Sequence, residues 1–220
     1  MIRPRQFDLI AFDWDGTLFD STALIARCIQ AACADVGVPV PSLRDASYVI
    51  GMGLSEALQH AAPDLPRERY REMGERYRHH YFAKQHEVLL FEGTLAMLQA
   101  LKERHHVLAV ATGKSRRGLD EALGSVQLKG LFDATRTADE TASKPDPKML
   151  LELMAEFGAT PQRTLMIGDT THDLQLAANA GAASVGVSYG AHDPAAFDAF
   201  PVLHVAHSVP DLNAWLARNA

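Results

Sequence analysis

The chain has 220 residues, of which 47% are hydrophobic and 22% are charged, and this composition predicts a globular fold and excludes a largely disordered chain. Its 21 Lys and Arg residues against 27 Asp and Glu residues give a net charge of −6, which argues against a nucleic-acid partner and favours a small molecule. No apolar stretch reaches the roughly 18 residues of a membrane span, and the N-terminal MIRPRQFD lacks the apolar middle of a signal peptide. We therefore expect a cytoplasmic protein with no membrane partner.

The first predicted element is a short buried strand over residues 7–12, followed at once by DWDGT. From Ser21 to Gln85 the apolar residues recur at intervals of three and four, which predicts helices. Cys28 and Cys33 lie on the apolar side of this pattern at a spacing that fits neither a zinc site nor a redox pair, so we expect them in the core.

Two features of this helical stretch allow a functional interpretation. The loop from Ile50 to Ser55 contains Gly51-Met52-Gly53, but Glu56 replaces the third glycine of a dinucleotide fingerprint, so the loop is either a specificity element or a plain helix cap. The stretch 67–80 carries a stripe of apolar residues and several basic ones. The basic residues favour a solvated helix face over a surface that attracts an anionic substrate. They are Arg67, Arg69, Arg71, Arg76 and Arg78, and the stripe is Tyr70, Met73 and Tyr77.

After residue 93 the predicted helices alternate with short apolar strands. The helices begin with one that Thr94 is expected to cap, and the others are predicted at 115–123, 147–157, 173–180 and 212–216. The strands are predicted at 107–111, 164–168, 184–187 and 202–206, the last at an edge. This alternation predicts an α/β fold with a Rossmann-like, doubly wound, mostly parallel sheet. Residues 1–18 and 87–220 would form this core, and residues 19–86 an inserted all-helical cap domain.

Polar residues follow three of the predicted strands. Asp13 and Asp15 follow the first, Thr112 the second, and Asp169 with Asp173 the third. Because ligands of such sheets bind at the carboxyl ends of the strands, these side chains are expected in one crevice. Converging carboxylates repel one another unless a cation lies among them or one stays protonated, and oxygen ligands without thiolates favour Mg²⁺.

The order of four motifs, DWDGT, ATGKS, SKPDP and GDTTHD, resembles that of the haloacid dehalogenase-like hydrolase superfamily. The helical insert after the first motif resembles the phosphoglycolate-phosphatase-like branch of that superfamily. The resemblance implies a Mg²⁺-dependent phosphatase that hydrolyses a small phosphate monoester, phosphoglycolate-like or a sugar phosphate. It implies that Asp13 is the nucleophile and forms an aspartyl-phosphate, and that Asp15 acts as general acid and then as base.

The resemblance also implies which residues hold the substrate and the metal. Thr112, Gly113 and Lys144 would hold the phosphoryl group. Asp169 would ligate Mg²⁺ together with Asp13 and the backbone carbonyl of Asp15, and Asp173 would support that metal shell. The partner would be a small phosphorylated metabolite, and the protein a monomer or a homodimer.

Other interpretations stay open or fail on particular residues. A phosphoryl-transferring mutase is not separated from a hydrolase. A haloacid dehalogenase of the same superfamily and a non-catalytic phospho-acceptor module are both disfavoured by Asp15. Gly113-Lys114-Ser115 is not the end of a nucleotide-binding P-loop, because Leu108 occupies the position of its first glycine. The histidines form no metal-like set and are expected at the surface, apart from His172, which should lie near the site without an assigned role.

Overall fold

The structure is a computed structural model that describes residues 6–124 and 128–220. The predicted lack of a signal peptide falls partly on residues 1–5, outside the described residues. None of the helices in the described part of the chain is long and apolar enough to cross a membrane.

A six-stranded sheet forms the centre of the fold, with the order β3-β2-β1-β4-β5-β6 and parallel pairing throughout. The strands are β1 Leu9–Phe12, β2 Val107–Thr112, β3 Ala134–Thr137, β4 Thr164–Gly168, β5 Ala183–Val187 and β6 Val202–Ala206. The predicted α/β class with a mostly parallel sheet is therefore confirmed. The sequence interpretation missed β3, an edge strand of four residues that is only partly buried up to Thr137.

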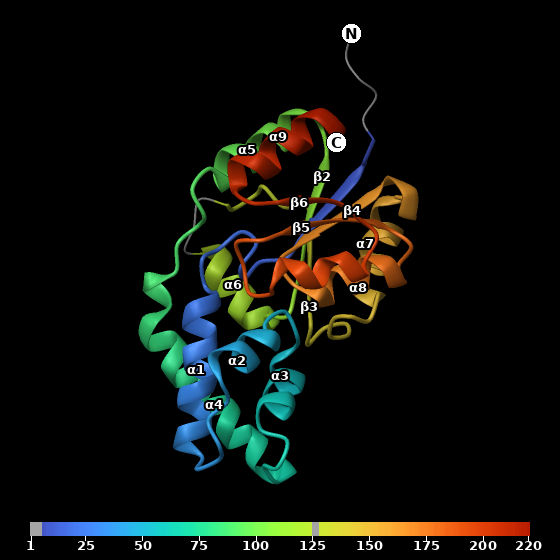
Figure 1. The fold of residues 1–220 in the computed structure, drawn as a ribbon. Helices are drawn as coiled ribbons and strands as arrows, with labels where there is room; N and C mark the ends of the chain where they lie inside the picture. The colour runs from blue at the N-terminus through green and yellow to red at the C-terminus, as the bar shows by residue number, and fades with distance from the viewer. Residues whose placement is uncertain (1–5, 125–127) are drawn as a thin grey trace.

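Helices cover both faces of this sheet, as Figure 1 shows. They are α5 Thr94–Glu103, α6 Arg116–Gly124, α7 Lys148–Phe157, α8 Thr171–Asn179 and α9 Val209–Asn219, with 3₁₀ turns at Pro161–Arg163 and Pro194–Ala199. Alternate residues of a strand point to opposite faces. Accordingly, Ile10 and Phe12 pack with α5, α6 and α9, whereas Leu9 and Ala11 pack with α7 and α8.

After β1 the chain leaves the sheet and forms a helical insert, whose first helix begins at Thr22 and whose last turn ends at Glu87, before it continues into α5 and β2. The insert contains α1 Thr22–Asp35, α2 Leu43–Tyr48, α3 Leu54–Ala61 and α4 Tyr70–Lys84, with 3₁₀ turns at Arg67–Arg69 and Gln85–Glu87. Its helices share a hydrophobic cluster of their own, which includes Ile29, Cys33 and Met73. The insert lies beyond the carboxyl ends of the strands (Figure 1). Cys28 and Cys33 are buried free thiols, as predicted.

Three local predictions were wrong: the cap at Thr94 and the surface positions of His106 and His192, the latter being 8% exposed. Gly93, with φ +87°, occupies the N-cap position of α5, so Thr94 is already the first helical residue and its hydroxyl caps nothing. A glycine suits this position because a side chain at positive φ is strained. His106 was expected at the surface but is 2% exposed, with Nδ1 2.9 Å from the Phe7 carbonyl oxygen.

Candidate active site

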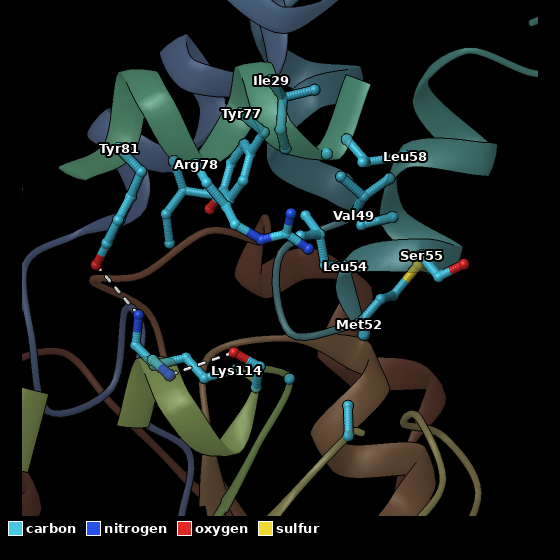
Figure 2. Close-up of a pocket in the computed structure, with 18 of the residues that line it drawn as sticks. Ile29, Val49, Met52, Leu54, Ser55, Leu58, Tyr77, Arg78, Tyr81 and Lys114 are labelled. Carbon is cyan, nitrogen blue, oxygen red and sulfur yellow. Dashed lines mark hydrogen bonds between the residues drawn. The ribbon is translucent and has the colours of Figure 1, made fainter. Parts of the chain in front are cut away.

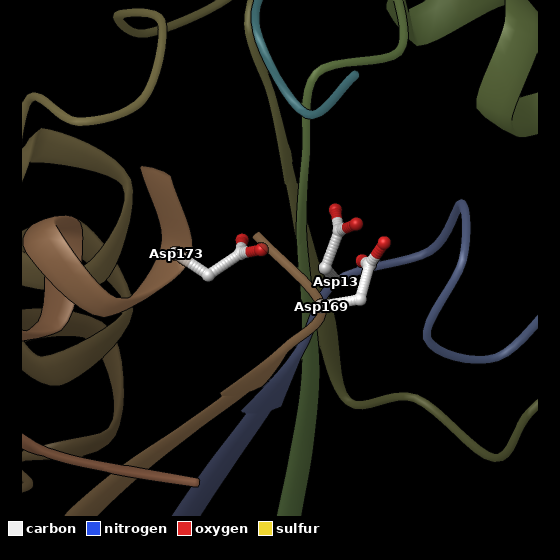
Figure 3. Close-up of side chains that lie close together, drawn as sticks. All are labelled: Asp13, Asp169 and Asp173. Carbon is white, nitrogen blue, oxygen red and sulfur yellow. The ribbon is translucent and has the colours of Figure 1, made fainter. Parts of the chain in front are cut away.

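Four charged side chains meet at the carboxyl ends of the central strands. Asp13 follows β1, Asp169 follows β4, Asp173 lies in the first turn of α8, and Lys144 precedes α7; all four are buried. The Lys144 Nζ donates to Asp13 Oδ1 and to Asp173 Oδ1, each at 2.6 Å. Figure 3 shows how the three carboxylates converge from separate segments of the chain.

Neighbouring donors hold two of these carboxylates in place. Asp169 accepts from the Thr17 hydroxyl at 2.9 Å and from the Ala191 N–H at 2.7 Å, one on each oxygen. Asp173 Oδ2 accepts from the Thr170 hydroxyl at 2.7 Å and from its N–H at 3.1 Å in the capping box of α8. By contrast, Asp13 Oδ2 is buried and has no hydrogen-bond partner among the described residues.

Burial makes this cluster electrostatically unusual. It raises the pKa of Asp13 far above its ordinary value, against the opposing effect of the Lys144 ammonium, and it raises the pKa of Asp169 as well. Burial alone would lower the pKa of Lys144, but the carboxylates of Asp13 and Asp173 outweigh it and raise that pKa. Three acids facing one ammonium leave a site that favours a further cation.

The donor atoms fit a hard divalent ion. One oxygen each of Asp13, Asp169 and Asp173 lie within 4.8 Å of one another, and the unpartnered Asp13 Oδ2 is an available ligand atom. A set made only of oxygens suits Mg²⁺ better than a softer metal. The Asp15 carboxylate is not part of this set; the predicted role of its backbone carbonyl stays a prediction.

Asp15 lies close enough to Asp13 to raise its pKa but has different partners. Its Oδ1 accepts from the Ser21 hydroxyl at 2.8 Å and lies 3.1 Å from the Lys114 Nζ. Lys114 Nζ also donates to the Tyr81 hydroxyl of α4 at 3.1 Å (Figure 2). Lys114, to which the sequence interpretation gave no role although it lies in the ATGKS motif, thus joins an acid of the core to the helical insert.

The loop from Ile50 to Ser55 covers the end of β2. A Cβ added at Gly113 would lie 2.3 Å from the Met52 carbonyl oxygen and 2.6 Å from that of Gly51, so the backbones are in close contact there. Thr112 is buried at the same strand end, and its hydroxyl accepts from the Lys114 N–H at 3.2 Å. Thr112 and Gly113 therefore lie at the end of β2, next to β1, and neither makes a hydrogen bond to Asp13, Asp169 or Asp173 in the described part of the chain.

Two core histidines bind one backbone carbonyl of the insert, and we call this arrangement the Tyr48 clasp. His192 Nδ1 accepts from the Thr171 N–H at 3.0 Å, so its Nε2 carries the proton and donates to the Tyr48 oxygen at 2.9 Å. His172 Nε2 lies 2.8 Å from the same oxygen. The Tyr48 and His192 rings stack at 5.3 Å, and burial lowers the pKa of both histidines, which favours the neutral forms.

A cavity of about 620 Å³ lies between the insert and the core (Figure 2). Asp15 and Gly113 line it, whereas Asp13, which is 1% exposed, is not part of the lining. The lining therefore reaches the second acid of the DWDGT motif and the end of β2.

Comparison with known proteins identifies the family. The family model described as haloacid dehalogenase-like hydrolase matches residues 10–187. The chain belongs to this family. A phosphoglycolate phosphatase from Aliivibrio fischeri is 35% identical over 195 residues, which are 84% of this chain and 86% of the relative. The probable phosphatase IndB from Dickeya dadantii is 37% identical over 84% of this chain and 82% of its own length.

Solved structures agree with this assignment. The structure of a predicted phosphoglycolate phosphatase from Haemophilus somnus superposes with a TM-score of 0.80 at 28% identity, over 94% of this chain and 96% of that one. A hydrolase from Pseudomonas syringae superposes with a TM-score of 0.88 at 24% identity. The superposition covers 98% of this chain and 100% of that one, and it shows the shared fold. The predicted family, its phosphoglycolate-phosphatase-like branch and the class of enzyme are confirmed.

The contact at Gly113 predicts a large effect from a single methyl group. Gly113→Ala would push a Cβ into backbone oxygens that cannot rotate away, so we expect a loss of about 1–3 kcal/mol in the free energy of unfolding, measured by urea denaturation. Gly118→Ala is the control, because the nearest atom to its Cβ is the Ser115 hydroxyl at 3.4 Å in an α-helix. Equal effects of the two substitutions would contradict the close contact.

Loss of the hydrogen bonds of the Tyr48 clasp should increase the local opening of residues 48–53. His192→Ala leaves the Thr171 N–H without its acceptor and removes a donor from the Tyr48 oxygen, which should cost about 1–3 kcal/mol. Amide hydrogen exchange should accelerate over residues 48–53. His86→Ala, at an exposed position outside the clasp, is the control. Unchanged exchange in His192→Ala would mean that the clasp does not hold the loop.

Proposed function

We propose that the protein is a Mg²⁺-dependent phosphatase that hydrolyses a small phosphate monoester through an aspartyl-phosphate on Asp13. One observation carries the proposal: Asp13 is a buried carboxylate with one oxygen held by Lys144 and the other without a partner among the described residues. A group that is anchored on one side and available on the other is suited to nucleophilic attack. The named phosphatases among the relatives support the same reaction.

In the first half of the reaction the Asp13 carboxylate attacks phosphorus. The bond between phosphorus and the ester oxygen breaks, and the departing oxygen takes a proton from the Asp15 carboxyl group. Thr112 and Gly113 hold the phosphoryl oxygens at the end of β2. The Lys144 ammonium, 2.6 Å from Asp13, offsets the negative charge that otherwise repels the carboxylate from the phosphate.

In the second half Asp15 acts as a base. Its carboxylate takes a proton from a water molecule, whose oxygen attacks phosphorus; the bond between phosphorus and Asp13 breaks, and inorganic phosphate leaves. Hydrogen bonding to Ser21 and the ion pair with Lys114 fix the Asp15 carboxylate for both proton transfers.

The metal site consists of Asp13, Asp169 and the backbone carbonyl of Asp15, with Asp173 in support. When bound, Mg²⁺ supplies positive charge beside the phosphoryl group. Asp169 is already oriented for this purpose by Thr17 and the Ala191 N–H.

The helical insert, residues 19–86, acts as a separate cap domain in this proposal. Because Asp13 is 1% exposed beneath the loop from Ile50 to Ser55, a substrate reaches it only when that loop moves away from the core. The loop therefore belongs to the substrate gate and is more than a helix cap.

The placement of Asp15 favours a phosphatase over the other members of the superfamily. A dehalogenase or a non-catalytic acceptor needs no proton donor at the leaving oxygen, whereas Asp15 lies in the wall of the cavity beside Asp13. Water and a sugar hydroxyl remain two possible acceptors, so the mutase stays an alternative. The cytoplasmic location and the monomeric or homodimeric state stay predictions.

Asp13→Asn should abolish phosphate release from 4-nitrophenyl phosphate, because an amide is not a nucleophile for phosphorus. The measurement is inorganic phosphate with and without Mg²⁺, and wild-type activity should require the metal. Asp20→Asn, an exposed acid seven residues further on, is the matched control and should remain active. Undiminished turnover by Asp13→Asn, or by wild type in excess chelator, would refute the proposal.

Asp15→Asn should slow the second half selectively. With 4-nitrophenyl phosphate the leaving group departs without a proton, so one burst of nitrophenolate is expected, followed by steady turnover reduced about 10²–10⁴-fold. Intact-protein mass spectrometry should then detect phosphorylated enzyme in Asp15→Asn but not in the double variant with Asp13→Asn. Normal turnover without trapped phosphoenzyme would remove Asp15 from the proton-transfer role.

A further inference from the structure

The cavity lies where the leaving group of the substrate would be. In the proposed reaction the phosphoryl group is at Asp13 and the leaving oxygen is at Asp15. Asp15 lines the cavity, so whatever is attached to that oxygen extends into it. The inference below therefore rests on the proposed function and names the class of substrate.

The size of the cavity does not match the smallest candidate substrates. At about 620 Å³ it falls in the middle of the range of roughly 300–1,000 Å³ found for sites that enclose drug-sized ligands. Phosphoglycolate carries only a two-carbon acid on its phosphate, and diphosphate carries only a second phosphate. Either would leave most of the cavity filled with water against apolar walls. Binding would then gain little free energy from the burial of apolar surface.

The walls on the side of the insert are mostly apolar, and their polar members are Ser55, Glu56, Arg71, Arg78 and Gln85. Branched aliphatic side chains come from α1, α3 and the loop before α3, and aromatic rings come from α4 (Figure 2). The Tyr77 and Tyr81 rings stack with centroids 6.0 Å apart and present flat surfaces. The residues that form these walls include Ile29, Val49, Leu54, Leu58, Tyr77 and Phe82. Such walls match an aromatic or branched aliphatic body.

One cation of the cavity lining, the exposed Arg78, has no hydrogen-bond or ion-pair partner among the described residues. Lys114 is paired with Asp15 and bonded to Tyr81, and Arg71 is paired with Glu75 at 3.1 Å. Arg78 lines the cavity from α4, extends into it in Figure 2, and makes no hydrogen bond or ion pair with any residue in the described ranges. Of the arginines that the sequence assigned to a solvated face, Arg78 is therefore placed to meet an anion.

We propose that the substrate is a phosphate monoester whose alcohol has an apolar, aromatic or branched aliphatic body and a second anionic group, which Arg78 binds. The phosphate lies at the sheet edge with Asp13 and Lys144, the ester oxygen faces Asp15, the apolar body packs against α1, α3 and α4, and the remote anion reaches the guanidinium. Phosphoglycolate and diphosphate are poor substrates for the same site.

The test compares kcat/KM for phosphate release from phenyl phosphate, 4-carboxyphenyl phosphate, phosphoglycolate and diphosphate, all with Mg²⁺. We expect both aryl esters to exceed phosphoglycolate and diphosphate. We expect the carboxylated ester to exceed the plain one by about tenfold, as one charge-assisted hydrogen bond allows. In Arg78→Gln that ratio should fall toward one. Arg76→Gln, exposed on the same helix and outside the cavity lining, should keep the wild-type ratio.

The outcomes separate this inference from the proposed function. No phosphate release from any of the compounds would defeat both. Preferred hydrolysis of phosphoglycolate or diphosphate would leave a phosphatase and overturn the proposed substrate class. A ratio that stays at its wild-type value in Arg78→Gln, or falls equally in Arg76→Gln, would overturn the assignment of Arg78.

Discussion

The contact between Lys144 and two buried carboxylates is the constraint on which the rest of the site depends. Its Nζ is 2.6 Å from both Asp13 and Asp173, and all three side chains are almost completely removed from water. Removing one partner of such a group commonly costs about 3–5 kcal/mol, because the remaining charge is left buried and unpaired. The cluster therefore fixes the segments after β1, before α7 and at the start of α8 relative to one another.

The neighbouring carboxylates are held in the same way. Every oxygen of Asp169 and Asp173 is satisfied by a hydroxyl, a backbone N–H or Lys144, so neither carboxylate can rotate freely. Asp13 Oδ2 alone lacks such a partner among the described residues. Catalysis by preorganised charge needs this kind of rigidity, since little reorganisation is left for the moment of reaction. The helical insert adds to this packing through the loop whose backbone contacts Gly113.

The sequence predicted the acidic cluster because parallel strands bring their carboxyl ends to one edge of the sheet. Polar residues that directly follow predicted strands are therefore expected to lie together even before the structure is known. It missed contacts that have no periodic signal. In the Tyr48 clasp, Tyr48 is separated along the sequence from His172 by 124 positions and from His192 by 144. His172 was therefore expected near the site without a role, and His192 was wrongly expected at the surface. The sequence did not predict β3, because a short, half-buried edge strand carries only a weak apolar pattern. The contacts of Lys114 were not predicted, because its partners Asp15 and Tyr81 come from distant segments of the sequence.

In the proposed mechanism the core and the insert have different tasks. This difference accounts for relatives that share a fold and carry the names of different activities. The charged groups for which we propose roles at phosphorus lie at or near the carboxyl ends of the strands and are constrained by mutual burial, so substitutions there are costly. Most of the cavity wall comes from the insert, whose side chains face a space and not a packed neighbour. Changes at such positions alter the shape and charge offered to the leaving group at little cost in stability. In the proposed mechanism, substrate choice can therefore vary through changes in the insert while the chemistry at the sheet edge stays the same.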